Sequence, residues 1–204
     1  MPSARYKTLI SNVAKLERRF LPKRLTGPFT IRQHDLARGF RLLAHAEIEA
    51  YLEDRAKEIS LEAVRRFQSN RKPHAVTLSL VAHCIVQGEL TDKYLKEKYT
   101  NQSDHLDAAV IAANNTYQYR LIQNHGIRED NILSLLLPVG FKVTEIEQAW
   151  LSQMNSFGKI RGETAHTSFA PTKLVDPKTE QTTVSQLIAG LQQIDDIFTR
   201  LKPR

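Results

Sequence analysis

The stretch IRQHDLARGFRLLAHAEIEAYLEDRAKE, residues 31–58, is the longest part of the chain with a helical period. Apolar side chains recur along one side of it, and charged residues such as Arg38, Arg41 and Glu53 lie largely off that side. The apolar side consists of Leu36, Phe40, Leu43, Ala44, Ile48, Tyr51 and Leu52. The pattern predicts a long amphipathic helix that forms the central pillar of the fold.

Glu47 lies in the middle of this apolar stripe. An unpartnered carboxylate at such a position would be costly, so we expect it to find a basic or hydrogen-bonding partner. A glutamate whose head group reaches water at the end of the stripe explains the position equally well.

The segments on either side of the long stretch also read as helices. Residues 3–20 carry apolar side chains at helical spacing, and Pro22 closes the run. Ser60 is a residue type favoured at helix N-caps and predicts a continuation that breaks at residues 70–73. The N-terminal third is therefore predicted to be helical.

The middle of the chain adds two further helices. Residues 75–87 predict a buried helix, and the charged, poorly periodic residues that follow predict a surface excursion over 88–103. The next helix starts at Ser103 or Asp104 and stops near Gly126, which we expect to be a left-handed C-cap.

The C-terminal third follows the same pattern. An apolar helix is predicted over residues 128–137, and Thr144 opens the next helix with Glu147 completing a capping box. A loop over 169–179 precedes a last amphipathic helix at 180–201. Because no segment has the period of a strand, the sequence predicts an all-α bundle with a long central helix and extra helices.

The composition favours one compact basic domain. The chain has 204 residues, of which 41% are hydrophobic, and this length fits a single domain over residues 1–204 better than two. There are 29 Lys and Arg against 22 Asp and Glu, a net charge of +7. The excess favours a polyanionic partner without choosing among nucleic acid, lipid and acidic protein.

Cysteine usage and hydropathy indicate the compartment. Cys84 is the only cysteine, so no intramolecular disulfide can form, and its apolar neighbours predict a small buried hydrophobe. The longest apolar stretch, residues 132–141, is short and broken by Pro138 and Gly140. With no signal-peptide core at the N-terminus, we expect a cytoplasmic protein without a membrane span.

The hexapeptide RGETAH, residues 161–166, is the candidate functional motif. Arg161 offers a permanently charged fork that matches phosphate oxygens, and His166 belongs to the residue type that transfers protons near neutral pH. Five residues correspond to about 140° around a regular helix, so a local bend at Gly162 would help both side chains reach one phosphate. Any basic helix of this length can carry such a pair by chance, on a solvated face.

Three pieces of the chain resemble the HEPN superfamily, specifically its RiboL-PSP-like branch. They are ARGFRLLAHAEIEAYLED at 37–54, QNHGIREDNILSLLLPVG at 123–140 and RGETAH at 161–166. The motif of the superfamily is an arginine followed after four to six residues by a histidine, and Arg161 and His166 match it with four between. One departure is Gly162, because many members place Asn, Asp or His there.

The resemblance implies a metal-independent endoribonuclease with no cofactor. His166 would act as general base on the ribose 2′-hydroxyl or as general acid to the leaving 5′-oxygen. Arg161 would stabilise the negative charge on the phosphorane. The products would be a 2′,3′-cyclic phosphate and a 5′-hydroxyl, and DNA would survive because it lacks the attacking hydroxyl.

The resemblance also implies supporting residues and partners. Glu163 or Thr164 would supply the polar group missing at Gly162, and Glu47 is a further supporting candidate. Besides RNA, the implied partners are a second copy of the chain, which would complete a composite cleft, and an antitoxin protein in a toxin or defence role. Glu53 and Lys57 have the spacing of an acidic and basic pair found in some HEPN groups, which is also that of an ordinary surface ion pair.

Other functions leave parts of the sequence unexplained. The seven histidines are scattered without zinc-ligand spacing, so no metal site is predicted. A non-catalytic HEPN module that binds RNA, a nucleotide or a partner protein is the main alternative, and Gly162 favours it. An all-α scaffold or DNA-binding adaptor would explain the basic charge but not the Arg161–His166 pair.

Overall fold

The computed structural model of the protein describes residues 1–91, 95, 105–166 and 174–202, and for residues 160–166 it describes the backbone alone. Every regular element in these ranges is helical, which confirms the predicted all-α fold. The helices are α1 (Ala4–Phe20), α2 (Ile31–Asn70), α3 (Ala75–Val86), α5 (His105–Ile122), α6 (Glu129–Leu136), η1 (Leu137–Val139), η2 (Val143–Glu145), α7 (Gln148–His166) and α8 (Pro177–Leu201).

The chain forms two compact units, and two long helices contribute to both. The first unit comprises Met1–Tyr51, Gly126–Glu129 and Ile146–Asp196, and the second comprises Leu52–His125, Asp130–Glu145 and Ile197–Arg204. Unit boundaries therefore fall within α2, within α8 and after the first residue of α6.

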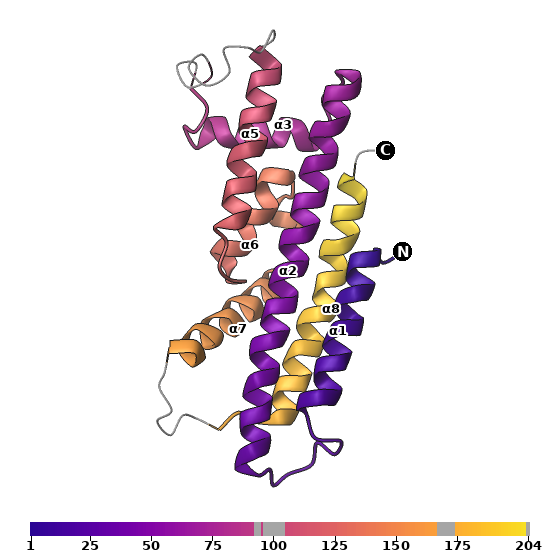
Figure 1. The fold of residues 1–204 in the computed structure, drawn as a ribbon, viewed down its shortest axis with the longest axis vertical. Coiled ribbons are helices and arrows are strands. Elements are labelled where there is room, and N and C mark those ends of the chain that lie inside the picture. Colours follow the sequence, from indigo (N-terminus) through magenta and orange to yellow (C-terminus); the bar gives the residue numbers. More distant parts are fainter. Residues whose placement is uncertain (92–94, 96–104, 167–173, 203–204) are drawn as a thin grey trace. The chain divides into compact units, whose positions relative to one another are not determined.

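In the first unit, α1 and the N-terminal part of α2 run beside α8 (Figure 1). The hydroxyl of Tyr6 on α1 donates to the Ile188 carbonyl of α8 at 2.9 Å. Arg41 of α2 forms an ion pair with Glu180 of α8, with Nε 2.7 Å from Oε2. Apolar side chains at helical spacing fill the space between these helices, among them Leu9, Val13, Phe40, Ile48, Val184, Leu187 and Leu191. The predicted amphipathic stripes of these helices thus form one core.

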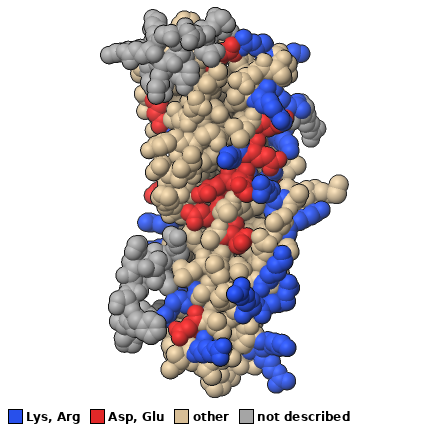
Figure 2. All heavy atoms as spheres, viewed as in Figure 1, with Lys and Arg blue, Asp and Glu red and all other residues tan. Residues whose placement is uncertain are grey.

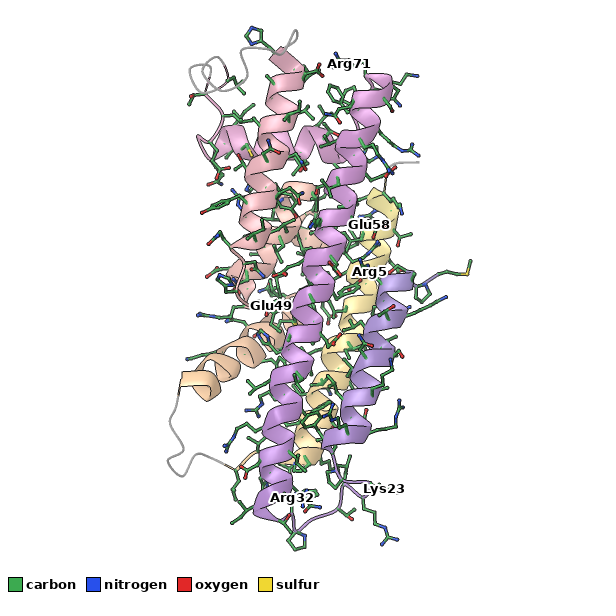
Figure 3. All side chains as sticks on the ribbon, viewed as in Figure 1. Arg5, Lys23, Arg32, Glu49, Glu58 and Arg71 are labelled. Carbon is green, nitrogen blue, oxygen red and sulfur yellow. The ribbon has the colours of Figure 1, made fainter. Side chains whose placement is uncertain are left out.

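The outer side of α1 is basic. The helix buries Tyr6, Leu9 and Val13, and its Lys and Arg residues are exposed. Figure 2 shows these basic side chains along the surface of α1 and the start of α2. In Figure 3 the side chains of Lys23 and Arg32 point away from the helices, at the end of the unit where α1 connects to α2.

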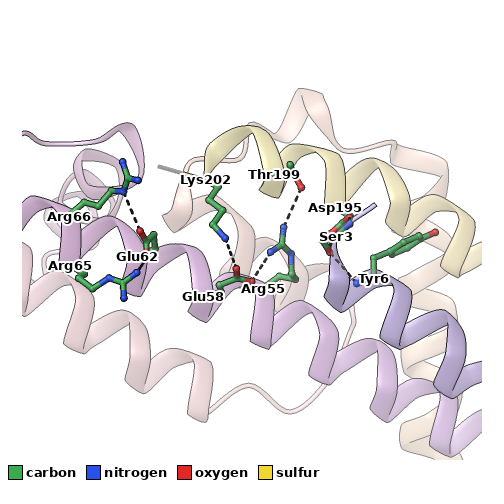
Figure 4. A network of polar contacts seen from close by, with 10 residues as sticks. All are labelled: Ser3, Tyr6, Arg55, Glu58, Glu62, Arg65, Arg66, Asp195, Thr199 and Lys202. Atoms are coloured by element: carbon green, nitrogen blue, oxygen red, sulfur yellow. Dashed lines mark hydrogen bonds and ion pairs between the residues drawn. The ribbon is translucent and has the colours of Figure 1, made fainter. Parts of the chain in front are cut away.

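A buried carboxylate, that of Asp195 on α8, connects three helices of the first unit. Asp195 is 0% exposed, and its Oδ1 accepts hydrogen bonds from the Tyr51 hydroxyl at 2.8 Å and the Ser3 hydroxyl at 2.6 Å. Its Oδ2 accepts the Ser3 backbone N–H at 2.7 Å (Figure 4). The Ser3 hydroxyl also caps α1 by accepting the Tyr6 N–H. The start of α1 is therefore fixed to α2 and α8 through one side chain.

The second unit combines the C-terminal part of α2 with α3, α5, nearly all of α6, η1, η2 and the C-terminal end of α8. The buried hydroxyl of Tyr117 on α5 donates to the Leu135 carbonyl of α6 at 2.5 Å. Cys84 of α3 is buried, as predicted, with its thiol 3.9 Å from the Ala113 carbonyl of α5. Burial, reinforced by Glu89, raises the pKa of the Cys84 thiol to about 12, so the reactive thiolate does not form at neutral pH.

Two predicted helix starts are wrong. Ser60 does not cap a new helix, because α2 continues to Asn70, and the buried Ser60 hydroxyl donates to the Lys57 carbonyl and accepts from Gln118 Nε2 at 2.9 Å. Thr144 does not open α7 either. It lies in the 3-10 turn η2, and α7 begins at Gln148, so the predicted capping box with Glu147 is absent.

Two further boundaries differ from the sequence prediction. The helix α5 ends at Ile122, and Gly126 has a φ of 157°, which is close to extended backbone and outside the range of a left-handed C-cap. The last helix begins at Pro177, so the loop predicted over 169–179 is shorter at its C-terminal end. Most of the predicted surface excursion over 88–103 lies outside the described residues.

Within the described ranges, no helix is long and apolar enough to cross a membrane.

Replacing Asp195 by alanine is expected to lower the free energy of unfolding by about 3 kcal/mol. The buried Tyr51 hydroxyl and the Ser3 N–H would lose their acceptor, and each unmade buried hydrogen bond costs about 1–3 kcal/mol. Urea unfolding measures the loss. Asp196→Ala is the matched control, because the adjacent carboxylate is exposed and its removal should change stability by less than about 0.5 kcal/mol. Equal effects of the two substitutions would contradict a structural role for Asp195.

Candidate functional site

The Arg161–His166 hexapeptide forms the last six residues of α7. The backbone of the helix continues to His166, as the sequence predicts, and Gly162 does not end it. The side chains of Arg161, Glu163, Thr164 and His166 lie outside what the structure describes, so their roles stay predictions.

The preceding turns of α7 are anchored in the core of the first unit. Trp150, Leu151, Met154 and Phe157 are each 4% exposed or less. The buried indole N–H of Trp150 donates to the Leu187 carbonyl of α8 at 3.0 Å. A Cβ added to Gly190, one turn further along α8, would lie 2.6 Å from Trp150 Nε1. The absence of a side chain at Gly190 therefore allows the indole to pack directly on α8.

The segment before α6 also contacts α7 near the motif. A Cβ added to Gly158 would lie 3.0 Å from Cγ of Arg128 and 3.3 Å from its backbone nitrogen. The Arg128 guanidinium donates from Nε to Asn155 Oδ1 at 3.4 Å. Arg128, which belongs to the resemblance piece 123–140, thus packs against the turn of α7 that precedes Arg161.

A buried histidine of α2, His45, packs against the same part of α7. Its ring stacks on Phe157, with centroids 6.1 Å apart and planes 24° apart. The His45 side chain is 1% exposed. Its Nδ1 lies 3.5 Å from Oε2 of Glu49, a residue labelled in Figure 3, and the two atoms form no hydrogen bond. From the sequence, His45 is predicted to be a structural or surface residue. Its burial against Phe157 depends on how α2 and α7 pack, which local sequence does not reveal.

Glu47 has the hydrogen-bonding partner that its place in the apolar stripe requires. Asn12 of α1 donates from Nδ2 to Glu47 Oε2 at 3.0 Å, and Glu47 is half-buried. The structure thus places this carboxylate between α1 and α2. Its role as a supporting residue for Arg161 and His166 stays a prediction.

Glu53 takes part in a polar cluster of the second unit. Its Oε1 accepts from Asn124 Nδ2 at 2.7 Å, and Asn124 Oδ1 accepts from Asn131 Nδ2 at 3.1 Å. Asn124 is 8% exposed. The cluster connects the resemblance pieces 37–54 and 123–140 to each other. The spacing to Lys57 did not reveal this contact, because it depends on residues about 70 positions further along.

Among the described residues, no group of three or more His, Cys, Asp and Glu side chains is placed to hold a metal ion. The histidines there have individual surroundings. His34 Nδ1 donates to the Val175 carbonyl at 2.8 Å, and His83 Nε2 lies 2.8 Å from an Arg120 nitrogen. Burial and the charge of Arg120 lower the pKa of His83, so it stays neutral at neutral pH.

An all-α fold in which a core-anchored helix ends in an arginine and a histidine with four residues between them is the architecture of a HEPN domain. The chain belongs to the RiboL-PSP-HEPN family, whose model matches residues 6–200. This confirms the resemblance, and membership supports either a ribonuclease or a nucleotide-binding module. No curated protein and no solved structure matches the chain.

Gly190→Ala is expected to destabilise the protein by about 2–3 kcal/mol. Alanine normally stabilises a helix relative to glycine by about 1 kcal/mol, but here its methyl group would displace the Trp150 indole and break its hydrogen bond to Leu187. Urea unfolding measures the free energy of unfolding, which should fall in Gly190→Ala although this substitution normally raises it within a helix.

Ser185→Ala, at an exposed position of the same helix, is the control and should be neutral or slightly stabilising. The loss should shrink when Gly190→Ala is combined with Trp150→Phe, because the smaller ring makes room. A stabilising Gly190→Ala would show that the contact between α7 and α8 adapts freely.

Proposed function

We propose that the protein is a metal-independent endoribonuclease whose catalytic residues are Arg161 and His166. The observation that carries the proposal is the family match over residues 6–200 together with the Arg-x4-His spacing in the last turns of α7. The described part of α7 supports it, because a helix held by Trp150 and Phe157 presents its C-terminal turns from a rigid base.

The proposed reaction uses the substrate's own nucleophile. His166 removes the proton of a ribose 2′-hydroxyl, whose oxygen attacks the adjacent phosphorus. The P–O5′ bond breaks, and the leaving oxygen takes a proton from a histidine or water. Arg161 binds the phosphate oxygens and stabilises the phosphorane. The products are a 2′,3′-cyclic phosphate and a 5′-hydroxyl.

Glu163, Thr164 and Glu47 are supporting residues in this proposal. Many HEPN proteins have a polar residue directly after the arginine, and this chain has Gly162. Glu163 or Thr164 would supply the missing hydrogen bond. The half-buried Glu47, held by Asn12, would supply a negative charge that supports Arg161 or a protonated His166.

The direct test is incubation of the protein with total and transfer RNA in EDTA, followed by mapping of the cut ends. Wild-type protein should cleave, and Arg161→Ala and His166→Ala should each lower the rate by at least about 100-fold, because each removes a group that acts in the transition state. A 2′-deoxy substitution at the cut site should abolish cleavage. Cleavage that requires a metal, or ends that carry a 5′-phosphate, would contradict the mechanism.

Matched controls separate catalysis from folding and from loss of charge. Arg65→Ala and His105→Ala remove the same residue types at exposed positions of the second unit, and both should cleave like wild type. Thermal unfolding of the Arg161 and His166 variants should match wild type. A variant that unfolds would indicate a structural role for the residue.

A non-catalytic module is the second candidate, and Gly162 favours it because the position lacks the usual polar side chain. Such a module would bind RNA, a nucleotide or a partner protein through the same residues. RNA binding without cleavage, lost in Arg161→Ala, would favour it over the ribonuclease.

The proposal includes a homodimer in which two motifs form one cleft, a cytoplasmic location, and a toxin or defence role with an antitoxin partner. Sedimentation equilibrium should give twice the 23.3 kDa chain mass. Because each site would draw on both copies, dilution below the dissociation constant should reduce cleavage per chain. A monomer with full activity would contradict the composite site.

A further inference from the structure

The excess positive charge of the protein is confined to its first 41 residues. Ten of the 29 Lys and Arg lie there, with only two of the 22 Asp and Glu, so residues 42–204 carry 19 basic against 20 acidic side chains. The net charge of +7 therefore arises at α1, the connection after it and the start of α2. Figure 2 shows the blue side chains over this region.

Five of the ten basic residues lie close to the connection between α1 and α2, and we call this group the basic end. They are Arg18, Arg19, Lys23, Arg24 and Arg32, and all five are exposed. Two are in the last turn of α1, two in the connection, and one at the start of α2. Figure 3 shows Lys23 and Arg32 extending outward at this end. Their charges therefore add in one region of the surface.

The two acidic side chains of residues 1–41 are engaged with residues outside the basic end. Glu17 is hydrogen-bonded to Gln181 of α8, and Asp35 pairs with Arg38 at 3.7 Å. In the ranges that the structure describes, none of the five basic-end residues forms an ion pair. Arg19 instead lies over the ring of Phe20, 5.6 Å from its centroid.

Basic residues of the second unit are arranged differently. Glu58 lies between Arg55 and Lys202, with contacts of 2.7 and 3.0 Å, and Glu62 pairs with Arg65 and Arg66 (Figure 4). These hydrogen bonds outweigh the effect of burial and lower the pKa of Glu58. The charge there is neutralised internally, which makes the unpaired basic end distinctive.

The chemistry of the basic end fits a chain of phosphates better than a lipid surface. The large apolar side chains exposed in residues 1–41 are Met1, Ile10 and Ile31. Met1 and Ile10 lie outside the basic end, and Ile31, which precedes Arg32, is one exposed side chain and not the continuous apolar face that an interfacial helix inserts into a membrane. Lys and Arg that remain unpaired on the surface bind phosphates by displacing counterions, without reading bases.

The fold also limits how far the basic end can lie from the motif. The Val175 carbonyl is bonded to His34 in the first turn of α2, and Val175 follows His166 by nine residues. At about 3.3–3.6 Å per residue, His166 lies within roughly 32 Å of that turn. A single strand advances about 3.4 Å per nucleotide when stacked, so roughly ten nucleotides span the distance.

We propose that the basic end is the surface that binds the phosphate backbone of the RNA substrate, independently of sequence. This inference rests on the proposed ribonuclease function and extends it. The basic end holds the strand by charge, and α7 supplies the chemistry at a point about ten nucleotides or fewer away.

The test measures binding of a 20-nucleotide single-stranded RNA to full-length His166→Ala protein, in EDTA, from 50 to 200 mM salt. In this background Arg18, Lys23, Arg24 and Arg32 are replaced by Gln. Each phosphate contact to a single strand contributes about 0.7 to the slope of log K against log salt, so the slope should fall by about 3. Affinity at 50 mM salt should fall at least about 100-fold, and single-stranded DNA should show the same change.

The control set Lys57→Gln, Arg65→Gln, Arg66→Gln and Lys202→Gln removes four charges from the second unit and should leave the slope within about one of the parent. Equal losses in both sets would show a net-charge effect and overturn the inference. So would unchanged binding of the basic-end variant, or tighter binding to phosphatidylserine vesicles than to RNA. If wild-type protein does not cleave RNA but the basic-end variant still loses binding, the ribonuclease proposal fails and the binding surface stands.

Discussion

The hydrogen bonds that the buried Asp195 carboxylate accepts are the interaction on which the packing of the first unit depends. A fully buried carboxylate is tolerated only when its oxygens are matched by donors, and here the backbone and side chain of Ser3 and the Tyr51 hydroxyl supply them. These contacts fix α8 relative to α1 and α2. Burial and the charges of Asp195 and Asp196 also raise the pKa of Tyr6, which keeps its phenol neutral. The helix α7 rests on α8 through Trp150, so the position of the motif follows from the same carboxylate.

The periodic features of the chain could be predicted from sequence, because burial of one helix face imposes a repeat of three or four residues. The long helix at 31–58, the break after Asn70 and the continuation of α7 to His166 all follow from this pattern. The two wrong helix starts concern Ser60 and Thr144, where a residue type suited to capping is used otherwise. Ser60 binds Gln118, which lies 58 positions away, and local sequence carries no trace of that partner.

In the candidate site, too, some features could be predicted from sequence and others could not. Arg161 and His166 are proposed from their spacing within one helix, and the need of Glu47 for a partner follows from its apolar neighbours. The partner itself, Asn12, could not be predicted, and neither could the stacking of His45 on Phe157. Both contacts join segments that are distant in sequence. They depend on how the helices pack, which composition and period leave open.

Net charge is a property of the whole chain. Only the distribution of that charge suggests that RNA binding and catalysis use different surfaces. In the proposed reaction the substrate provides the nucleophile, so two side chains at the end of α7 are enough for the chemistry. The proposed contacts from the basic end to phosphates would remain the same in the ground state and the transition state, and such uniform binding lowers KM without raising kcat. Contacts from Arg161 strengthen as charge builds on the phosphorane, and these affect kcat. Separate surfaces therefore allow affinity for RNA and the rate of cleavage to vary independently.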